Sequence, residues 1–259
     1  MDNIIQDRSD GYLSNVFARD GYLVIPGLCP PNLLADMRTC ALAHLNPVLG
    51  PAEFEADLGY PGAPAGPDEP GGGTPRRLLH AYSRSQVFRD WAAGKLIGDH
   101  LRRLFGREDV YLSQCHHNCI MTKHPGHSSA TMWHQDIRYW SFDRPELISV
   151  WLALGLETSE NGALKFIPGS HRVDVEQGRL DSALFLRTDL EENQVMIEKA
   201  KSLELEQGDV LFFHCRSFHA AGMNLTDELK LSVVFTYHTG DNNPISRTRS
   251  ARLPGVLLA

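Results

Sequence analysis

The chain has 259 residues, of which 42% are hydrophobic and 22% charged, and its formal net charge is -7. This composition is ordinary for a soluble globular protein, and no basic stripe indicates a nucleic-acid surface. No apolar run reaches the length of a transmembrane helix, and the start Met1-Asp2-Asn3 lacks the apolar core of a signal peptide. The five cysteines include no C-x-x-C pair, so they indicate neither a disulfide framework nor a structural zinc site. We therefore expect a cytoplasmic protein with reduced thiols and without a nucleic-acid or membrane partner.

The length fits one domain, and we expect residues 1–259 to form it because no repeat or linker separates two cores. A turn at Asp20-Gly21 leads into a short strand that ends before Pro26. Asn32 is expected to cap a helix that runs to about Ala43. The Gly/Pro-rich stretch 50–75 predicts a long loop, with a lid and a plain solvent loop as equal alternatives. A helical stretch is expected at about 85–105, with a break near Gly94.

After Val110 the pattern becomes that of β structure. Short apolar or alternating runs are separated by Gly, Pro and Asn, as is typical of a sandwich or a barrel. The expected strands cover residues 110–113, 118–122, 131–133, 148–154, 164–167, 210–213 and 231–237. We therefore predict a mainly β fold, in which the earlier helices cover the outside of one sheet.

The sequence Trp133-His134-Gln135-Asp136 contains a candidate metal site. On a β-strand, His134 and Asp136 lie on the same face. Two histidines and one carboxylate, with coordination positions left open, are typical of non-haem Fe(II) oxygenases. The second histidine must come from elsewhere in the chain, and both His214 and His219 are available. His219 is favoured because small residues follow it, whereas His214 continues an apolar strand.

A late strand carries a candidate site for a carboxylate. Alternation along the sequence 230–237 places Lys230 and Ser232 on the same face. A cation and a hydroxyl at this spacing form a clamp that suits the far carboxylate of a dicarboxylic cosubstrate. Lys123 is a second basic candidate, but we assign it to the turn 123–126 that leads into the metal strand.

Together these motifs resemble the phytanoyl-CoA dioxygenase (PhyH) family of Fe(II)- and 2-oxoglutarate-dependent oxygenases. The resemblance extends from about residue 16 to residue 237, and it rests on H-Q-D at 134–136, on NGALKFIPGSH at 161–171, on Gly208-Asp209, and on His219 with Asn224. It implies a double-stranded β-helix (a cupin-like jelly roll) with flanking N-terminal helices. It also implies His134, Asp136 and His219 as the iron ligands, with 2-oxoglutarate and O2 as cosubstrates. The family usually has Arg at the position of Lys230, so a point charge replaces a bidentate fork.

The resemblance further implies hydroxylation of a small molecule with release of succinate and CO2. Asp136 argues against halogenation, because related halogenases have a small residue there that leaves room for a halide. Desaturation, epimerisation and cyclisation stay open. Gln114 and Asn118, four residues apart on one expected strand face, are placed near the cosubstrate together with Trp151. Trp140 is expected to wall the substrate pocket.

Two alternatives from other classes remain. One is a non-catalytic jelly-roll protein that binds a metal or a ligand, and Lys230 is its only support. The other is a zinc hydrolase with the same three ligands, which ranks lower because no general base is evident. The remaining histidines and Cys115, Cys119 and Cys215 are expected to be structural.

The segment 173–201 is expected to close over the substrate, and its excess of acidic residues disfavours a polyanion such as a CoA thioester. For the tail 239–259, order over the pocket, a role in oligomerisation and a loose chain all stay open, and the sequence does not decide the oligomeric state.

Overall fold

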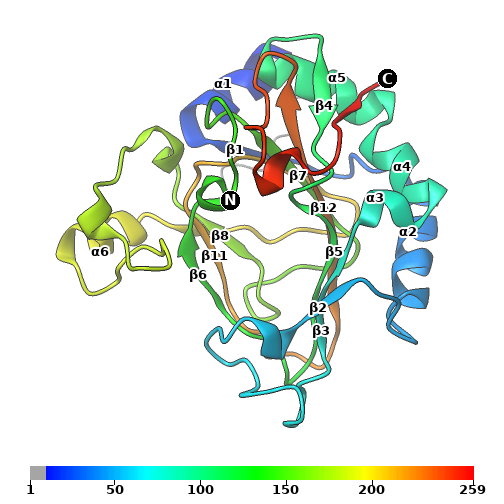
Figure 1. The fold of residues 1–259 in the computed structure, drawn as a ribbon, viewed down its shortest axis with the longest axis vertical. Coiled ribbons are helices and arrows are strands. Elements are labelled where there is room, and N and C mark those ends of the chain that lie inside the picture. The colour runs from blue at the N-terminus through cyan, green and yellow to red at the C-terminus, as the bar shows by residue number, and fades with distance from the viewer. Residues whose placement is uncertain (1–9) are drawn as a thin grey trace.

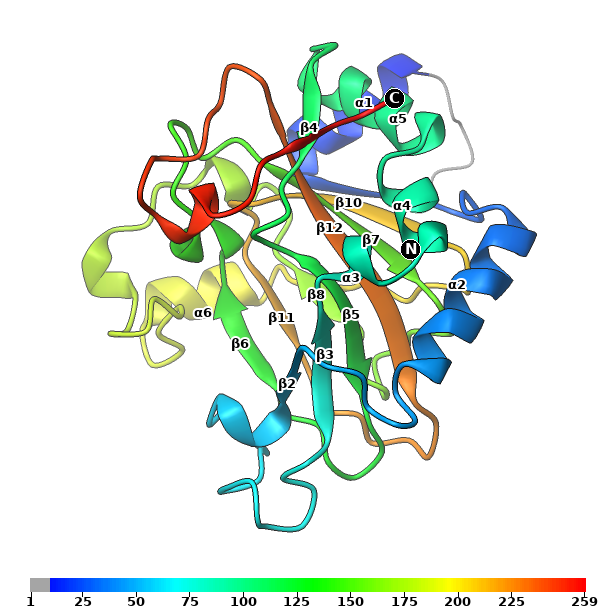
Figure 2. The same ribbon diagram turned by 45° about the vertical axis from the view of Figure 1, so that its right-hand side comes forward.

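The computed structural model describes residues 10–259, and two antiparallel sheets form its centre (Figure 1, Figure 2). In the described chain the large sheet has nine strands in the order β1-β10-β7-β12-β5-β3-β2, with β4 beside β12 and β13 beside β4. Its strands are β1 (Tyr22–Ile25), β2 (Ala52–Phe54), β3 (Pro75–Leu79), β4 (Val110–Leu112), β5 (Asn118–Lys123), β7 (Ile148–Ala153), β10 (Val210–His214), β12 (Lys230–Thr239) and β13 (Val256–Leu257). The small sheet has the order β6-β11-β8-β9, with β6 (Thr131–His134), β11 (His219–Ala221), β8 (Leu164–Phe166) and β9 (Lys201–Ser202). The predicted mainly β jelly roll is confirmed.

The alternation of β12 separates two hydrophobic cores. Leu231, Val233 and Phe235 belong to the core between the large sheet and the helices, as the sequence pattern predicts. Val234 belongs to the inner core between the two sheets, together with Trp151. The inner face of β12 is therefore the face from which polar side chains reach the interior of the jelly roll.

The helices α1 (Asp10–Asp20), α2 (Pro31–Ala43), α4 (Gln86–Ala92) and α5 (Lys95–Phe105) pack on the outer core. Figure 2 shows α2, α4 and α5 along one side of the large sheet. The predicted break falls at Gly94, which precedes α5, and a further short helix, α3 (Ala81–Arg84), comes before α4. None of the helices in residues 10–259 combines the length and the apolar character needed to cross a membrane.

Two details at the N-terminal side differ from the sequence predictions. The helix α1 was not predicted, although Leu13, Val16 and Phe17 have helical spacing and are buried in the outer core. Asn32 does not cap α2, because that helix already begins at Pro31 and has no side-chain cap. A proline in the first turn has a helical φ and no N–H group that needs a partner, so the helix starts there without a cap.

The stretch 50–75 is more ordered than predicted. It contains β2 and the 3-10 helix η1 (Glu55–Asp57), and its last residue, Pro75, begins β3, which pairs with β5. The irregular loop is therefore limited to residues 58–74, the cyan segment at the bottom of Figure 1. The strand β3 escaped prediction because Arg76 and Arg77 break its apolar pattern. Both side chains are accommodated by ion pairs with Glu53 and Glu55.

The segment 173–201 and the C-terminal tail both lie against the jelly roll. The former contains the 3-10 helix η4 (Gln177–Arg179) and α6 (Glu191–Ile197), which Figure 1 shows beyond β6. The sequence left three alternatives for the tail 239–259, and the structure shows it ordered. It forms the 3-10 helix η5 (Arg249–Ala251) and the strand β13, which pairs with β4. The tail thus adds an edge strand to the large sheet beside β4.

Candidate active site

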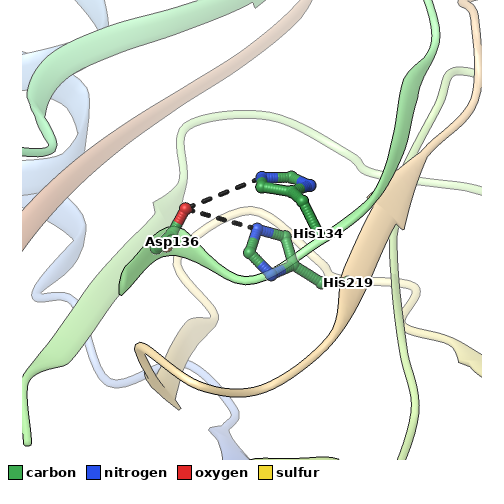
Figure 3. Close-up of side chains that lie close together, drawn as sticks. All are labelled: His134, Asp136 and His219. Atoms are coloured by element: carbon green, nitrogen blue, oxygen red, sulfur yellow. Dashed lines mark ion pairs between the residues drawn. The ribbon is translucent and has the colours of Figure 1, made fainter. Parts of the chain in front are cut away.

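The three predicted metal ligands converge at the edge of the small sheet (Figure 3). His134 ends β6 and lies opposite His219, the first residue of β11, in the strand register. The Oδ1 atom of Asp136 lies 3.7 Å from the Nε2 atom of His134 and 3.7 Å from that of His219. One correction concerns Asp136, which begins the 3-10 helix η2 (Asp136–Tyr139) instead of continuing the strand. The chain turns there, and the carboxylate still faces both imidazoles.

Each histidine of the triad is fixed by a hydrogen bond to its own backbone. The Nδ1 atom of His134 lies 2.8 Å from the carbonyl oxygen of Met132, and that of His219 lies 3.0 Å from the carbonyl oxygen of Ser217. A carbonyl only accepts, so each Nδ1 carries the proton and each Nε2 keeps its lone pair. Contacts of this kind orient metal-bound histidines, and a donor set of two imidazoles and one carboxylate fits Fe(II).

Burial and mutual interactions keep Asp136 and His219 in their metal-binding protonation states. Burial and, to a smaller extent, the nearby His134 lower the pKa of His219 to about 3. Burial alone raises the pKa of Asp136, but His117, His219 and His134 outweigh it and hold this pKa below its usual range. At neutral pH the site therefore combines a carboxylate with a neutral imidazole at His219. Within residues 10–259, this triad is the one group of three or more His, Cys, Asp or Glu side chains placed to share a metal ion.

His214, the alternative to His219, is not part of the triad. It ends β10, and its Nδ1 atom accepts a hydrogen bond of 3.1 Å from the backbone N–H of Arg216. Burial, with smaller contributions from His171 and Arg216, lowers the pKa of His214 to about 3. The prediction that His214 is a packed strand residue is confirmed.

The triad opens into a cavity of about 230 Å³ between the two sheets. Aromatic side chains form much of its wall, among them Trp140, Trp151, Tyr60, Tyr139 and Phe213. Trp140 stacks on His116 with the ring centroids 5.2 Å apart. Both tryptophans thus line the cavity where the sequence analysis placed them, and their roles toward bound ligands stay predictions.

Lys230 also lines the cavity, but it has a partner that the sequence analysis missed. Its Nζ atom lies 3.0 Å from the Oε2 atom of Glu157, and both side chains are buried. The Oε1 atom of Glu157 accepts hydrogen bonds from the Nε1–H group of Trp151, at 2.8 Å, and from the hydroxyl of Ser232, at 2.5 Å. Ser232 thus donates to Glu157, and its contact with a cosubstrate stays a prediction. This glutamate lies after β7, where its backbone forms an isolated β-bridge with Leu205, and the sequence pattern alone indicates an exposed side chain.

Lys123 is the second correction on this wall. It is the last residue of β5 instead of part of a turn, and it lies opposite Lys230 in the strand register. Its side chain is buried and lines the cavity, and its Nζ atom donates a hydrogen bond of 2.6 Å to the carbonyl oxygen of Ser129. Arg76 and Arg77 of β3 line the same wall and were also missed.

Gln114 and Asn118 do not share a strand face, because β5 begins at Asn118 and Gln114 lies in the bend before it. The amide of Gln114 donates to the carbonyl oxygen of Pro254 in the tail. The amide oxygen of Asn118 accepts from the backbone N–H of Tyr82. Both residues line a neighbouring cavity, and their side-chain amides form hydrogen bonds with backbone groups.

Comparison with known proteins agrees with this site. The family described as phytanoyl-CoA dioxygenase (PhyH) matches residues 17–232 of the chain. The chain belongs to the phytanoyl-CoA dioxygenase family. This match covers nearly the whole range over which the sequence motifs resemble the family.

Two characterised relatives illustrate the similarity. Dioxygenase lolE1 of Epichloe uncinata is 32% identical over 164 residues, which are 62% of this chain and 58% of that protein. The ectoine dioxygenase of Stutzerimonas stutzeri is 26% identical over 243 residues, which are 87% of this chain and 76% of that protein. The chain thus spans about three fifths of the first relative and three quarters of the second.

Solved structures share the fold. EctD from S. alaskensis with 2-oxoglutarate and 5-hydroxyectoine has a TM-score of 0.75 at 20% identity, over 94% of this chain and 82% of that one. The epimerase SnoN with Fe3+, alpha ketoglutarate and nogalamycin RO has a TM-score of 0.73 at 22% identity, over 96% of this chain and 95% of that one. With the family match and the triad, these likenesses assign the chain to the non-haem Fe(II)- and 2-oxoglutarate-dependent dioxygenases.

Proposed function

We propose that the protein hydroxylates a small organic molecule and converts 2-oxoglutarate to succinate and CO2. The observation that carries this proposal is the buried triad at the wall of an aromatic and cationic cavity. His134, Asp136 and His219 would hold Fe(II), and the bound iron would supply the oxidation of a C–H bond by O2. The described residues act in this proposal as one oxygenase domain.

The chain itself contributes position, charge and exclusion of water. Lys230 and the neighbouring cations of the large sheet attract the far carboxylate of 2-oxoglutarate. The aromatic wall with Trp140 and Trp151 holds the substrate in a space that admits little water. A cavity of about 230 Å³ suits a small molecule and not a bulky thioester. The relatives named ectoine dioxygenase support this size class.

The substrate is proposed to carry an anionic group that meets Arg249. This residue of η5 lines the cavity and lowers the pKa of His116 and of His117. None of the ion pairs found in residues 10–259 includes Arg249. Arg249→Met should therefore weaken the response to carboxylate-bearing candidate substrates, whereas Arg247→Met, outside the cavity, should not.

We place this reaction in the cytoplasm, because the five cysteines are all free thiols in the structure and thiols persist in a reducing compartment.

The first test is an anaerobic titration of the apoprotein with Fe(II) and then with 2-oxoglutarate, followed by visible absorption. A charge-transfer band that needs both additions is the expected result, and candidate substrates are then screened by their effect on this band. Succinate formation is measured next in air for the wild type and for His134→Ala, Asp136→Ala and His219→Ala. Binding without any oxygen consumption would favour the non-catalytic alternative. Turnover retained in all three folded variants would contradict the proposal.

A further inference from the structure

Among the cationic side chains that reach the cavity from the described strands, all but one form an ion pair with a glutamate. Four cations reach the cavity from strands of the large sheet: Arg76, Arg77, Lys123 and Lys230. Arg77 lies 2.7 Å from Glu53, and Arg76 lies 3.5 Å from Glu55. These two arginines and two glutamates together carry no net charge.

The positive charge of Lys230 is also balanced by a carboxylate. Glu157 contacts its ammonium group at 3.0 Å and is completely buried, with Trp151 and Ser232 holding the other carboxylate oxygen. Since neither oxygen of Glu157 is in contact with water, its negative charge acts on Lys230 with little screening. A further carboxylate that approaches Lys230 is therefore repelled by Glu157 while the ammonium attracts it.

Lys123 is the cation without a carboxylate. Its hydrogen-bond partner is the neutral carbonyl oxygen of Ser129, and none of the ion pairs in the part of the chain that the structure describes includes it. It faces Lys230 across the pairing of β5 with β12. We call Lys123 and Lys230 the lysine pair.

We propose that Lys123 provides the net positive charge that holds the far carboxylate of 2-oxoglutarate, and that Glu157 serves as a fixed counter-ion that positions Lys230. This inference rests on the proposed function, in which 2-oxoglutarate occupies the cavity. Lys230 keeps a role in this proposal although it is already paired with Glu157. Its N–H groups still donate hydrogen bonds to the far carboxylate and orient it toward Lys123.

The proposal has a consequence for protons. Lys123 is surrounded by Lys230 from β12, Arg76 from β3, Glu55 from η1 and Glu157 after β7. Burial, with the two cations, lowers the pKa of Lys123 to about 7, although both carboxylates raise it. At pH 8 the free amine is therefore mostly neutral, and a bound carboxylate raises its pKa. Binding of 2-oxoglutarate at pH 8 should then take up about 0.9 proton.

Calorimetry on the Fe(II)-loaded protein without O2 measures both quantities. The enthalpy of 2-oxoglutarate binding in two buffers of different ionisation enthalpy gives the number of protons taken up. Lys123→Met should weaken 2-oxoglutarate binding by about 10- to 100-fold and abolish the uptake. It should leave binding of 2-oxobutyrate unchanged, because this keto acid lacks the far carboxylate. Lys165→Met, at an exposed position of β8, is the matched control and should behave as the wild type.

A second variant distinguishes the loss of the Lys123 charge from a structural defect caused by Lys123→Met. Glu157→Gln removes the counter-ion at nearly constant shape, so Lys230 regains a net charge. The double variant with Lys123→Met and Glu157→Gln should therefore recover most of the affinity lost in Lys123→Met alone. A structural defect at Lys123 would not be repaired by a second change of this kind.

The outcomes distinguish this inference from the proposed function. A wild type that does not bind 2-oxoglutarate contradicts the proposed function. A Lys123→Met variant that binds 2-oxoglutarate as tightly as the wild type contradicts the role of Lys123 alone. So does a Lys123→Met variant that loses 2-oxoglutarate and 2-oxobutyrate equally.

Discussion

The metal triad and the lysine pair line the same cavity but are positioned in different ways. In the triad, each histidine is oriented by a carbonyl oxygen two residues before it, as in the contact of His219 with Ser217. Lys230 of the lysine pair instead depends on a side chain from a distant part of the chain, since Glu157 is 73 residues before it in the sequence. Because the contacts of the triad histidines are local, a short sequence motif is enough to predict how these histidines are oriented. The lysine pair is readable only from the folded structure.

The largest expected effect tests whether position, and not burial, defines the triad. His219→Ala removes a ligand, so iron-dependent succinate formation should fall by more than about 100-fold, beyond the loss caused by removing a supporting contact. His214→Ala is the matched control, because His214 is also a histidine with a low pKa on the neighbouring strand β10. Steady-state assays should show most of the activity in this control. Equal losses in both variants would mean that the triad has no special role.

The sequence predictions succeeded where local pattern determines structure. The alternation of β12 correctly separated Leu231 and Val233 from Lys230, and the H-x-D motif with His219 identified the triad. These cases depend on the side-chain period of a strand and on residues near one another in sequence.

The predictions failed where a partner lies far away in the chain. Lys123 was assigned to a turn because Pro125 and Gly126 follow it, yet pairing with β12 extends β5 to Lys123. The hydrogen bond from Ser232 to Glu157 was missed because nothing near Ser232 in the sequence indicates that partner. A buried glutamate outside the regular strands has no sequence signature, since its burial is decided by Lys230, Trp151 and Ser232 after folding.

The next effect is on stability and tests the dependence of the lysine pair on its counter-ion. Glu157→Ala leaves Lys230 buried without a negative partner, and breaking such a pair costs about 3–5 kcal/mol. Urea denaturation of the apoprotein measures this loss. The exposed Glu160→Ala should change the free energy of unfolding by less than about 0.5 kcal/mol.

Adding Lys230→Met to Glu157→Ala should restore much of the stability, because the uncompensated charge is then gone. This double variant should bind 2-oxoglutarate more weakly than the wild type, because the donors of Lys230 are lost, but more tightly than Lys123→Met, because Lys123 still supplies the net charge. A loss below about 1 kcal/mol in Glu157→Ala would show that Lys230 finds another partner or water, and that the counter-ion is dispensable.

The smallest effect concerns His214, which shares a lowered pKa with His219 but is only half-buried and lies outside the triad. The pKa of His214 is about 3 in the folded protein, below the ordinary value of 6.5, chiefly because of burial. Below pH 6.5 the unfolded chain therefore binds a proton that the folded protein does not, and the stability falls as the pH falls toward 3. Between pH 6.5 and pH 5 this contribution amounts to at most about 2 kcal/mol.

His214→Gln should remove that part of the acid sensitivity of the apoprotein and keep an acceptor for the N–H group of Arg216. Urea unfolding at pH 7 and at pH 5 gives the difference in stability for each variant, and His127→Gln at an exposed position is the control. An unchanged acid sensitivity in His214→Gln would place the titrating groups among the other histidines whose pKa is lowered by burial, which include His116, His219 and His238. Of these, His219 belongs to the triad, so a titration there would make the apo site itself the part of the cavity that is sensitive to acid.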